Sequence, residues 1–200
     1  MDYLKEVNWI FTSGWLLGTV SLMVACLGLG CWVWRLKKRV RCCYTVQRDL
    51  QYLSEYDLLS GLKNRNAFMN YLQICGTDAL LVMACDIDGL KLVNDHLGHY
   101  AGDRLICRAA AILRNAAPAQ AQIFRMGGDE FLLLVPLSCL SGGATELEEK
   151  VLQQVQAHNI SYADLPLSLS LGSVSMQDGR RQSLQEAIKE ADVYMYEKKT

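Results

Sequence analysis

The chain has 200 residues, of which 51% are hydrophobic, and a formal net charge of −1 at pH 7. This length allows one globular domain and a short additional segment, and the near-neutral charge argues against a nucleic-acid partner. The eight cysteines contain no C-x-x-C pair, so we expect free thiols in a reducing compartment rather than a disulfide framework or a zinc site. Four cysteines beside apolar runs are expected to be buried: Cys75, Cys85, Cys107 and Cys139.

An uncharged, mostly apolar segment covers residues 7–34. It exceeds the roughly 20 residues that a helix needs to cross a bilayer, and tryptophans stand near both of its ends. A cleaved signal peptide is the alternative, but it would carry positive charge before its apolar core. Here the basic residues follow, between Arg35 and Arg41. The positive-inside rule therefore predicts a retained single-pass transmembrane helix, with residues 1–6 extracytoplasmic and the later residues in the cytoplasm.

Residues 35–56 have a helical pattern, since apolar residues recur at steps of three and four. This juxtamembrane stretch is about two and a half heptads long, too short for an independent coiled coil. It is either a linker helix that holds two copies side by side or an amphipathic helix that packs on its own domain. Gly14 and Gly18 form a G-x-x-x-G in the apolar segment, a spacing that allows close helix pairing but is also common in unpaired spans.

Residues 57–200 alternate between helical and strand patterns. Periodicity predicts helices over 66–75, 101–116, 145–158 and 183–199, and strands over 79–85, 121–124, 131–135 and 167–175. The last of these strands alternates Leu and Ser, so we expect it to be half-buried. This order predicts an α/β (α+β) sandwich with a mixed central sheet flanked by helices.

The sequence RMGGDEF at residues 125–131 joins two apolar runs. Glycine reaches the positive φ values that tight turns require, so this stretch predicts a β-hairpin. The run 131–135 is apolar on both faces, and we expect its strand inside the sheet. Two carboxylates, Asp129 and Glu130, then lie at the end of a buried strand, where negative charge needs a partner.

A second acidic corner, Asp86-Ile87-Asp88, follows the predicted strand 79–85. Gly-Gly-Asp alone is most often only a turn. Two strand ends that carry carboxylates, however, can converge on a hard cation such as Mg²⁺, which would remove the repulsion between them. We therefore expect the side chains of Asp86 and Asp129 to meet.

Five polar residues lie between the two acidic corners: Lys91, Asn94, Asp95, His99 and Asp103. Each has an ordinary explanation as a turn residue, a helix-start residue or a loop cap. Taken together they suit a nucleotide, because amide and carboxylate oxygens accept the N–H donors of a guanine edge. A lysine offers a point charge to phosphate.

These motifs, in this order, resemble the GGDEF family of diguanylate cyclases over residues 57–199. The resemblance rests on five stretches, which are DLLSGLKNR at 57–65, the block from Asp86 to Asp103, MGGDEF at 126–131, Ser170-Leu171-Gly172, and the segment from Ala191 to Lys199. It implies a nucleotidyl-cyclase-like palm fold and a catalytic domain at residues 57–200, preceded by the transmembrane helix 7–34 and the linker helix 35–56.

The resemblance also implies a reaction, in which two GTP condense to cyclic di-GMP and two pyrophosphates. It implies Mg²⁺ as cofactor, with Mn²⁺ as the alternative, and a homodimer in which each subunit holds one GTP. The chain would be anchored in the lipid of the bacterial inner membrane. The alternative is a catalytically silent GGDEF module that binds GTP or docks on another cyclase.

By matching position, the resemblance assigns the metal ion to Asp86, the backbone carbonyl of Ile87, and Asp129. Asp129 or Glu130 would help to deprotonate the attacking 3′-hydroxyl, and Lys91 would stabilise charge on the phosphates. The substrate-binding residues would be Asn94 and Asp103 at the guanine, His99 nearby, and Lys199 at the phosphates.

The chain departs from the family pattern at four places. Leu90 stands where an aromatic residue is usual, and Tyr194 replaces a small residue. The sequence ends at Thr200, where relatives usually continue through a short glycine-containing tail. Many relatives carry an Arg-x-x-Asp product-inhibition site before the hairpin, but residues 118–121 here read Pro-Ala-Gln-Ala, so we expect no feedback inhibition through that site.

Overall fold

The computed structural model describes the backbone of residues 3–74, 79–177 and 181–199. Within these ranges it describes the side chains of Met23 and of Gly28 onward, except at 46, 49 and 181–183. The chain divides into two compact units, Met1–Gln51 and Tyr52–Thr200, and the predicted site belongs to the second.

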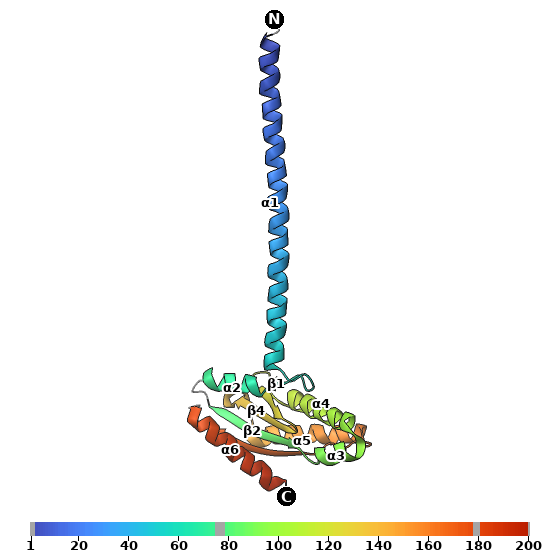
Figure 1. Ribbon diagram of the computed structural model, residues 1–200. Helices are drawn as coiled ribbons and strands as arrows, with labels where there is room; N and C mark the ends of the chain where they lie inside the picture. The colour runs from blue at the N-terminus through green and yellow to red at the C-terminus, as the bar shows by residue number, and fades with distance from the viewer. Residues whose placement is uncertain (1–2, 75–78, 178–180, 200) are drawn as a thin grey trace. The chain divides into compact units, whose positions relative to one another are not determined.

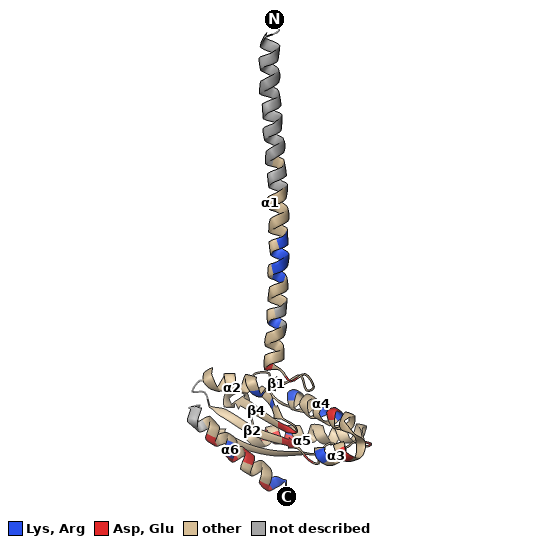
Figure 2. Cartoon of the chain, in the orientation of Figure 1, with Lys and Arg blue, Asp and Glu red and all other residues tan. Residues whose placement is uncertain are grey.

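Helix α1 (Tyr3–Glu55) is one uninterrupted helix over both the expected membrane segment and the expected linker. Its basic residues gather in the stretch 35–41, blue in Figure 2. Among the described residues, no helix has an apolar window that meets the requirement for crossing a membrane. Most side chains of the expected span 7–34 lie outside the described residues, and the span stays a prediction.

The second unit contains a mixed sheet, as expected, and this sheet has five strands in the order β1-β3-β4-β2-β5. Only β1 and β3 pair in parallel, and the other neighbours are antiparallel. Strand β4 lies between β3 and β2, which confirms the prediction of an internal strand. The bounds are β1 (Lys63–Asn64), β2 (Leu80–Ile87), β3 (Gln122–Gly127), β4 (Glu130–Pro136) and β5 (Leu169–Met176).

Helices cover both faces of this sheet (Figure 1). Alternate residues of β2 therefore enter two separate cores, with Leu81 and Met83 in one and Val82 and Ala84 in the other. The first core is completed by α3 (Leu90–Leu97), α4 (His99–Ala116) and α5 (Gly143–Ser161), and the second by α2 (Arg65–Ile74) and α6 (Arg181–Lys198). A short 3₁₀ turn, Leu137–Cys139, follows β4. All eight residues of β2 are buried, because both of its faces are covered.

Three features differ from the sequence-based expectations. Strand β1 and helix α3 were not expected, because β1 has two residues and Leu90 is the one buried residue of α3. The first four residues of β5 are all buried rather than alternating, because α6 packs closely on Gly172, where a Cβ atom would overlap backbone atoms of α6. Cys107 is exposed and Cys139 is half-buried, whereas Cys85 is buried as expected. Cys75 lies outside the described residues.

Candidate active site at the ends of β2 and β4

The two acidic corners lie side by side in the sheet. Asp86 at the end of β2 is paired with Glu130 at the start of β4, and the backbone N–H of Ile87 donates to the carbonyl of Asp129 at 3.2 Å. The carboxylates of Asp86 and Asp129 are close enough to repel each other electrostatically. The expectation that these residues meet is therefore consistent with the strand register.

Asp86 is a buried carboxylate, with 6% of its surface exposed. Burial raises its pKa most, and the negative charges of Asp129 and Asp88 raise the pKa further, against a lowering by Lys199. The Nζ atom of Lys199 lies 2.5 Å from Asp86 Oδ1, and this hydrogen bond raises the pKa of Lys199. Lys199 thus supplies the charge partner that a buried carboxylate requires.

Asp88 is held by the beginning of β5. Its two carboxylate oxygens accept hydrogen bonds from the hydroxyls of Ser168 at 2.6 Å and Ser170 at 2.7 Å. Its backbone N–H donates to the carbonyl of Ser168 at 3.1 Å. The serines of the Leu–Ser alternation therefore fix the acidic corner, a role that the alternation alone did not reveal.

Arg125 stabilises the hairpin turn. Gly128 has a φ of 48°, so the turn requires glycine there. Arg125 donates from Nε and Nη2 to the carbonyl of Gly128, at 3.1 and 2.7 Å. Its Nη1 atom donates to Asp57 Oδ1 at 2.9 Å. The start of the second unit is thereby linked to the turn that carries Asp129.

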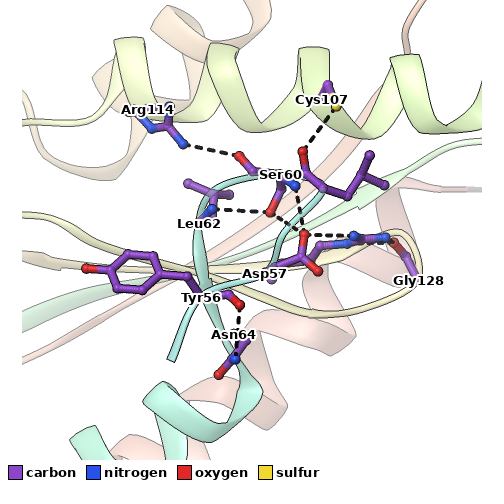
Figure 3. A network of polar contacts seen from close by, with 10 residues as sticks. Tyr56, Asp57, Ser60, Leu62, Asn64, Cys107, Arg114 and Gly128 are labelled. Carbon is purple, nitrogen blue, oxygen red and sulfur yellow. Dashed lines mark hydrogen bonds and ion pairs between the residues drawn. The ribbon is translucent and has the colours of Figure 1, made fainter. Parts of the chain in front are cut away.

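Asp57 also organises its own loop (Figure 3). Its Oδ1 atom accepts hydrogen bonds from the backbone N–H and the hydroxyl of Ser60, at 2.8 and 2.7 Å. Burial opposes ionisation of Asp57, but the hydrogen bonds from Ser60 and Arg125 outweigh it and lower the pKa. This ion pair was not predicted from the sequence, although Asp57 and Arg125 carry opposite charges, which was a signal for it.

The predicted nucleotide-binding residues occupy α3 and the first turns of α4. Lys91, His99 and Asp103 are exposed, and Asn94 is half-buried. Asn94 packs against Gly102, where a Cβ atom would overlap the side-chain oxygen of Asn94. Gly102, which directly precedes Asp103, is therefore required for the position of Asn94. Among the described residues, no side-chain hydrogen bond or ion pair joins this set to Asp86, Asp88 or Asp129.

The acidic strand ends fit Mg²⁺ better than a metal held entirely by protein. Within the part of the chain that the structure describes, no three His, Cys, Asp or Glu side chains cluster as ligands. Two carboxylates and a backbone carbonyl suit an ion that keeps several waters and binds substrate phosphates. Glu130 is exposed and lines, with Asp192 and Tyr196 of α6, a neighbouring pocket of about 310 Å³.

Comparisons with known proteins agree on one family. The family profile described as "Diguanylate cyclase, GGDEF domain" matches residues 54–200. The chain is 34% identical over 158 residues to the bifunctional diguanylate cyclase/cyclic di-GMP phosphodiesterase MucR of Pseudomonas aeruginosa, covering 76% of this chain and 23% of MucR. It is 32% identical over 163 residues to the diguanylate cyclase DgcM of Escherichia coli K12, covering 77% of this chain and 38% of DgcM. The chain thus spans well under half of the length of either relative.

A solved structure confirms the fold. The coiled coil and GGDEF domain of DgcB from Caulobacter crescentus, in complex with c-di-GMP, superposes with a TM-score of 0.66 at 21% identity. The match covers 84% of this chain and 92% of that one. The mixed sheet flanked by helices is therefore the GGDEF fold.

Proposed function

We propose, since the chain belongs to the GGDEF-domain family of diguanylate cyclases, that it condenses two GTP into cyclic di-GMP and releases two pyrophosphates. The observation that carries this proposal is the pairing of Asp86 with Glu130, beside which Asp129 interacts electrostatically with Asp86. A hairpin with a purely structural role has no need for adjacent carboxylates, whereas phosphoryl chemistry needs them for its metal ion.

Mg²⁺, or Mn²⁺ in its place, would be held by Asp86, Asp129 and the backbone carbonyl of Ile87. When bound, the ion supplies positive charge that offsets the charge of the phosphates. Lys91 would add to this charge from the start of α3. A ribose hydroxyl is a poor nucleophile at neutral pH, so Asp129 or Glu130 would accept its proton during the attack.

The remaining residues would bind the substrate. Asn94 and Asp103 would accept the N–H donors of guanine, with His99 beside the nucleotide and Lys199 at the phosphates. The close packing of Asn94 on Gly102 supports this assignment, because a recognition side chain must be held in position before the ligand arrives.

Turnover would require a homodimer, because each copy holds one GTP and two must face each other. This arrangement makes the attack effectively intramolecular, so a monomer should bind GTP without turnover. The uncharged segment 7–34, followed by basic residues, supports a single-pass anchor in the lipid of the bacterial inner membrane. The domain at 57–200 would then be cytoplasmic, and the linker helix 35–56 would hold two copies together.

Incubation of the full chain with GTP and Mg²⁺, followed by chromatography of the products, tests the reaction. We expect cyclic di-GMP and pyrophosphate in a ratio of about 1:2, and no product after chelation of the metal. GTP binding without product, even when two copies are joined by a fused dimerisation domain, would establish instead the silent module that binds GTP or docks on another cyclase. Retention of the chain in membranes after alkaline carbonate washing tests the anchor separately.

A further inference from the structure

Lys199 binds the carboxylate that the proposed function gives to the metal ion. Its Nζ atom lies 2.5 Å from Asp86 Oδ1, which is a charge-assisted hydrogen bond. The oxygen engaged in this bond has less electron density to offer a divalent cation. We infer, on the basis of the proposed function, that Lys199 and the divalent cation compete for Asp86. Metal binding then releases Lys199 from this carboxylate.

The position of the ammonium group supports this competition. Lys199 interacts electrostatically with three carboxylates, those of Asp86, Asp88 and Asp129. Asp88 and Asp129 each interact electrostatically with Asp86 as well. A single positive charge beside this group of carboxylates lies where a doubly charged ion would also be favoured. Lys199 is thus an internal counter-ion with half the charge of its competitor.

The surroundings of Lys199 allow it to leave without disturbing α6. Its side chain is 36% exposed, against 9% for the side chain of Asp86, so its ammonium can move into solvent. The neighbouring Lys198 pairs with Glu148 of α5 at 2.9 Å, and Glu148 also accepts a hydrogen bond from Ser173 of β5. The end of α6 therefore keeps its own attachment when Lys199 is released.

Binding of Mn²⁺ alone to the full chain in mild detergent, with no nucleotide present, tests the inference. Electron paramagnetic resonance of free Mn²⁺ gives the affinity without any need for turnover. Lys199→Met removes the competing charge, so we expect Mn²⁺ to bind about threefold to tenfold more tightly, as for loss of a partly exposed ion pair. Lys199→Arg keeps the charge and should bind no more tightly than the wild type.

Lys198→Met is the matched control, because it removes the same positive charge from the adjacent residue and leaves the ion pair of Lys199 with Asp86 in place. Unchanged or weaker Mn²⁺ binding by Lys199→Met would overturn the inference, and so would equal tightening by Lys198→Met, which would indicate a general charge effect. Lys199→Gln serves if the methionine variant does not fold, as judged by circular dichroism. Cyclic di-GMP synthesis is measured separately in the wild type, so a chain that shows the competition but no synthesis refutes only the proposed function.

Discussion

The acidic strand ends and the face formed by α3 and α4 hold their polar groups in opposite ways. At the strand ends, Asp86 pairs with Lys199, and Asp88 accepts hydrogen bonds from two serines. On α3 and α4, Lys91, His99 and Asp103 are exposed side chains. The first group is positioned by the tertiary structure, and the second is displayed on helix surfaces.

Burial explains this difference. A buried carboxylate is costly unless it is partnered, so the fold must supply partners wherever it buries one. An exposed polar group remains hydrated and needs no partner within the protein. We therefore expect substitutions at the strand ends to affect chemistry and stability, and substitutions of Asn94, His99 or Asp103 to affect GTP binding.

Asp129→Asn should have the largest effect. The amide keeps the size of the side chain but removes a proposed metal-binding charge, so cyclic di-GMP formation should fall on the order of 10³-fold or more. Product chromatography measures this loss, and circular dichroism checks that the variant is folded. Glu149→Gln removes one charge from an exposed position of α5 and should leave the rate within about twofold. Similar rates for Asp129→Asn and the wild type would remove Asp129 from the catalytic group.

Gly172→Ala tests the support of the strand ends. The new methyl group would overlap backbone atoms of Ala191 and Met195 in α6, so stability should fall by about 1–3 kcal/mol, as for other overpacked sites. Thermal unfolding measures the change. Gly30→Ala is the control, because no described neighbour lies within 4 Å of the added methyl group there. An unchanged melting temperature would mean that α6 can shift freely on β5.

Gly102→Ala tests the other region. Its methyl group would displace Asn94, so the dissociation constant for GTP should rise about tenfold, the cost of one lost hydrogen bond to the base. Titration with a non-hydrolysable GTP analogue measures this change, with Asn94→Ala as the reference. Gly102→Ala should leave metal binding unaltered. If Mn²⁺ affinity fell together with GTP affinity, the separation of the two regions would be wrong.

The ion pair of Asp57 and Arg125 should make a smaller contribution that depends on pH. Because the pKa of Asp57 is lowered in the folded chain, its stabilisation is present above the ordinary value of about 3.9. It is lost as the pH falls through the folded value. Asp57→Asn should lower the melting temperature by roughly 2–4 °C at pH 7. The difference in melting temperature between the variant and the wild type should narrow below about pH 4. A difference that stayed constant with pH would contradict the role given to the Asp57 carboxylate.

Added cyclic di-GMP should have the smallest effect. Residues 118–121 lack the guanidinium and carboxylate of the product-inhibition motif, so initial rates should not change when micromolar product is added. Rates are followed by pyrophosphate release. Strong inhibition that disappears when Gln120 is changed to Ala would show that this loop binds product.

Much of the fold was predictable because it depends on local patterns. The run 131–135 is apolar at every position, which predicted the internal strand β4, and the helix 101–116 followed from its apolar stripe. Helix α3 was missed because Leu90 is its one buried residue. Burial of Ser170 was missed because the residue type predicts exposure, whereas its partner Asp88 lies 82 positions away.

By itself the sequence determined the family and predicted which residues carry the chemistry, because side-chain types and their spacing are written in the chain. The tertiary structure alone decided which of them meet. Asp86 and Lys199 are 113 positions apart, and no local pattern encodes their contact. It arises because β5 pairs with β2 and α6 packs against both strands, and because a buried carboxylate at that place requires a positive charge.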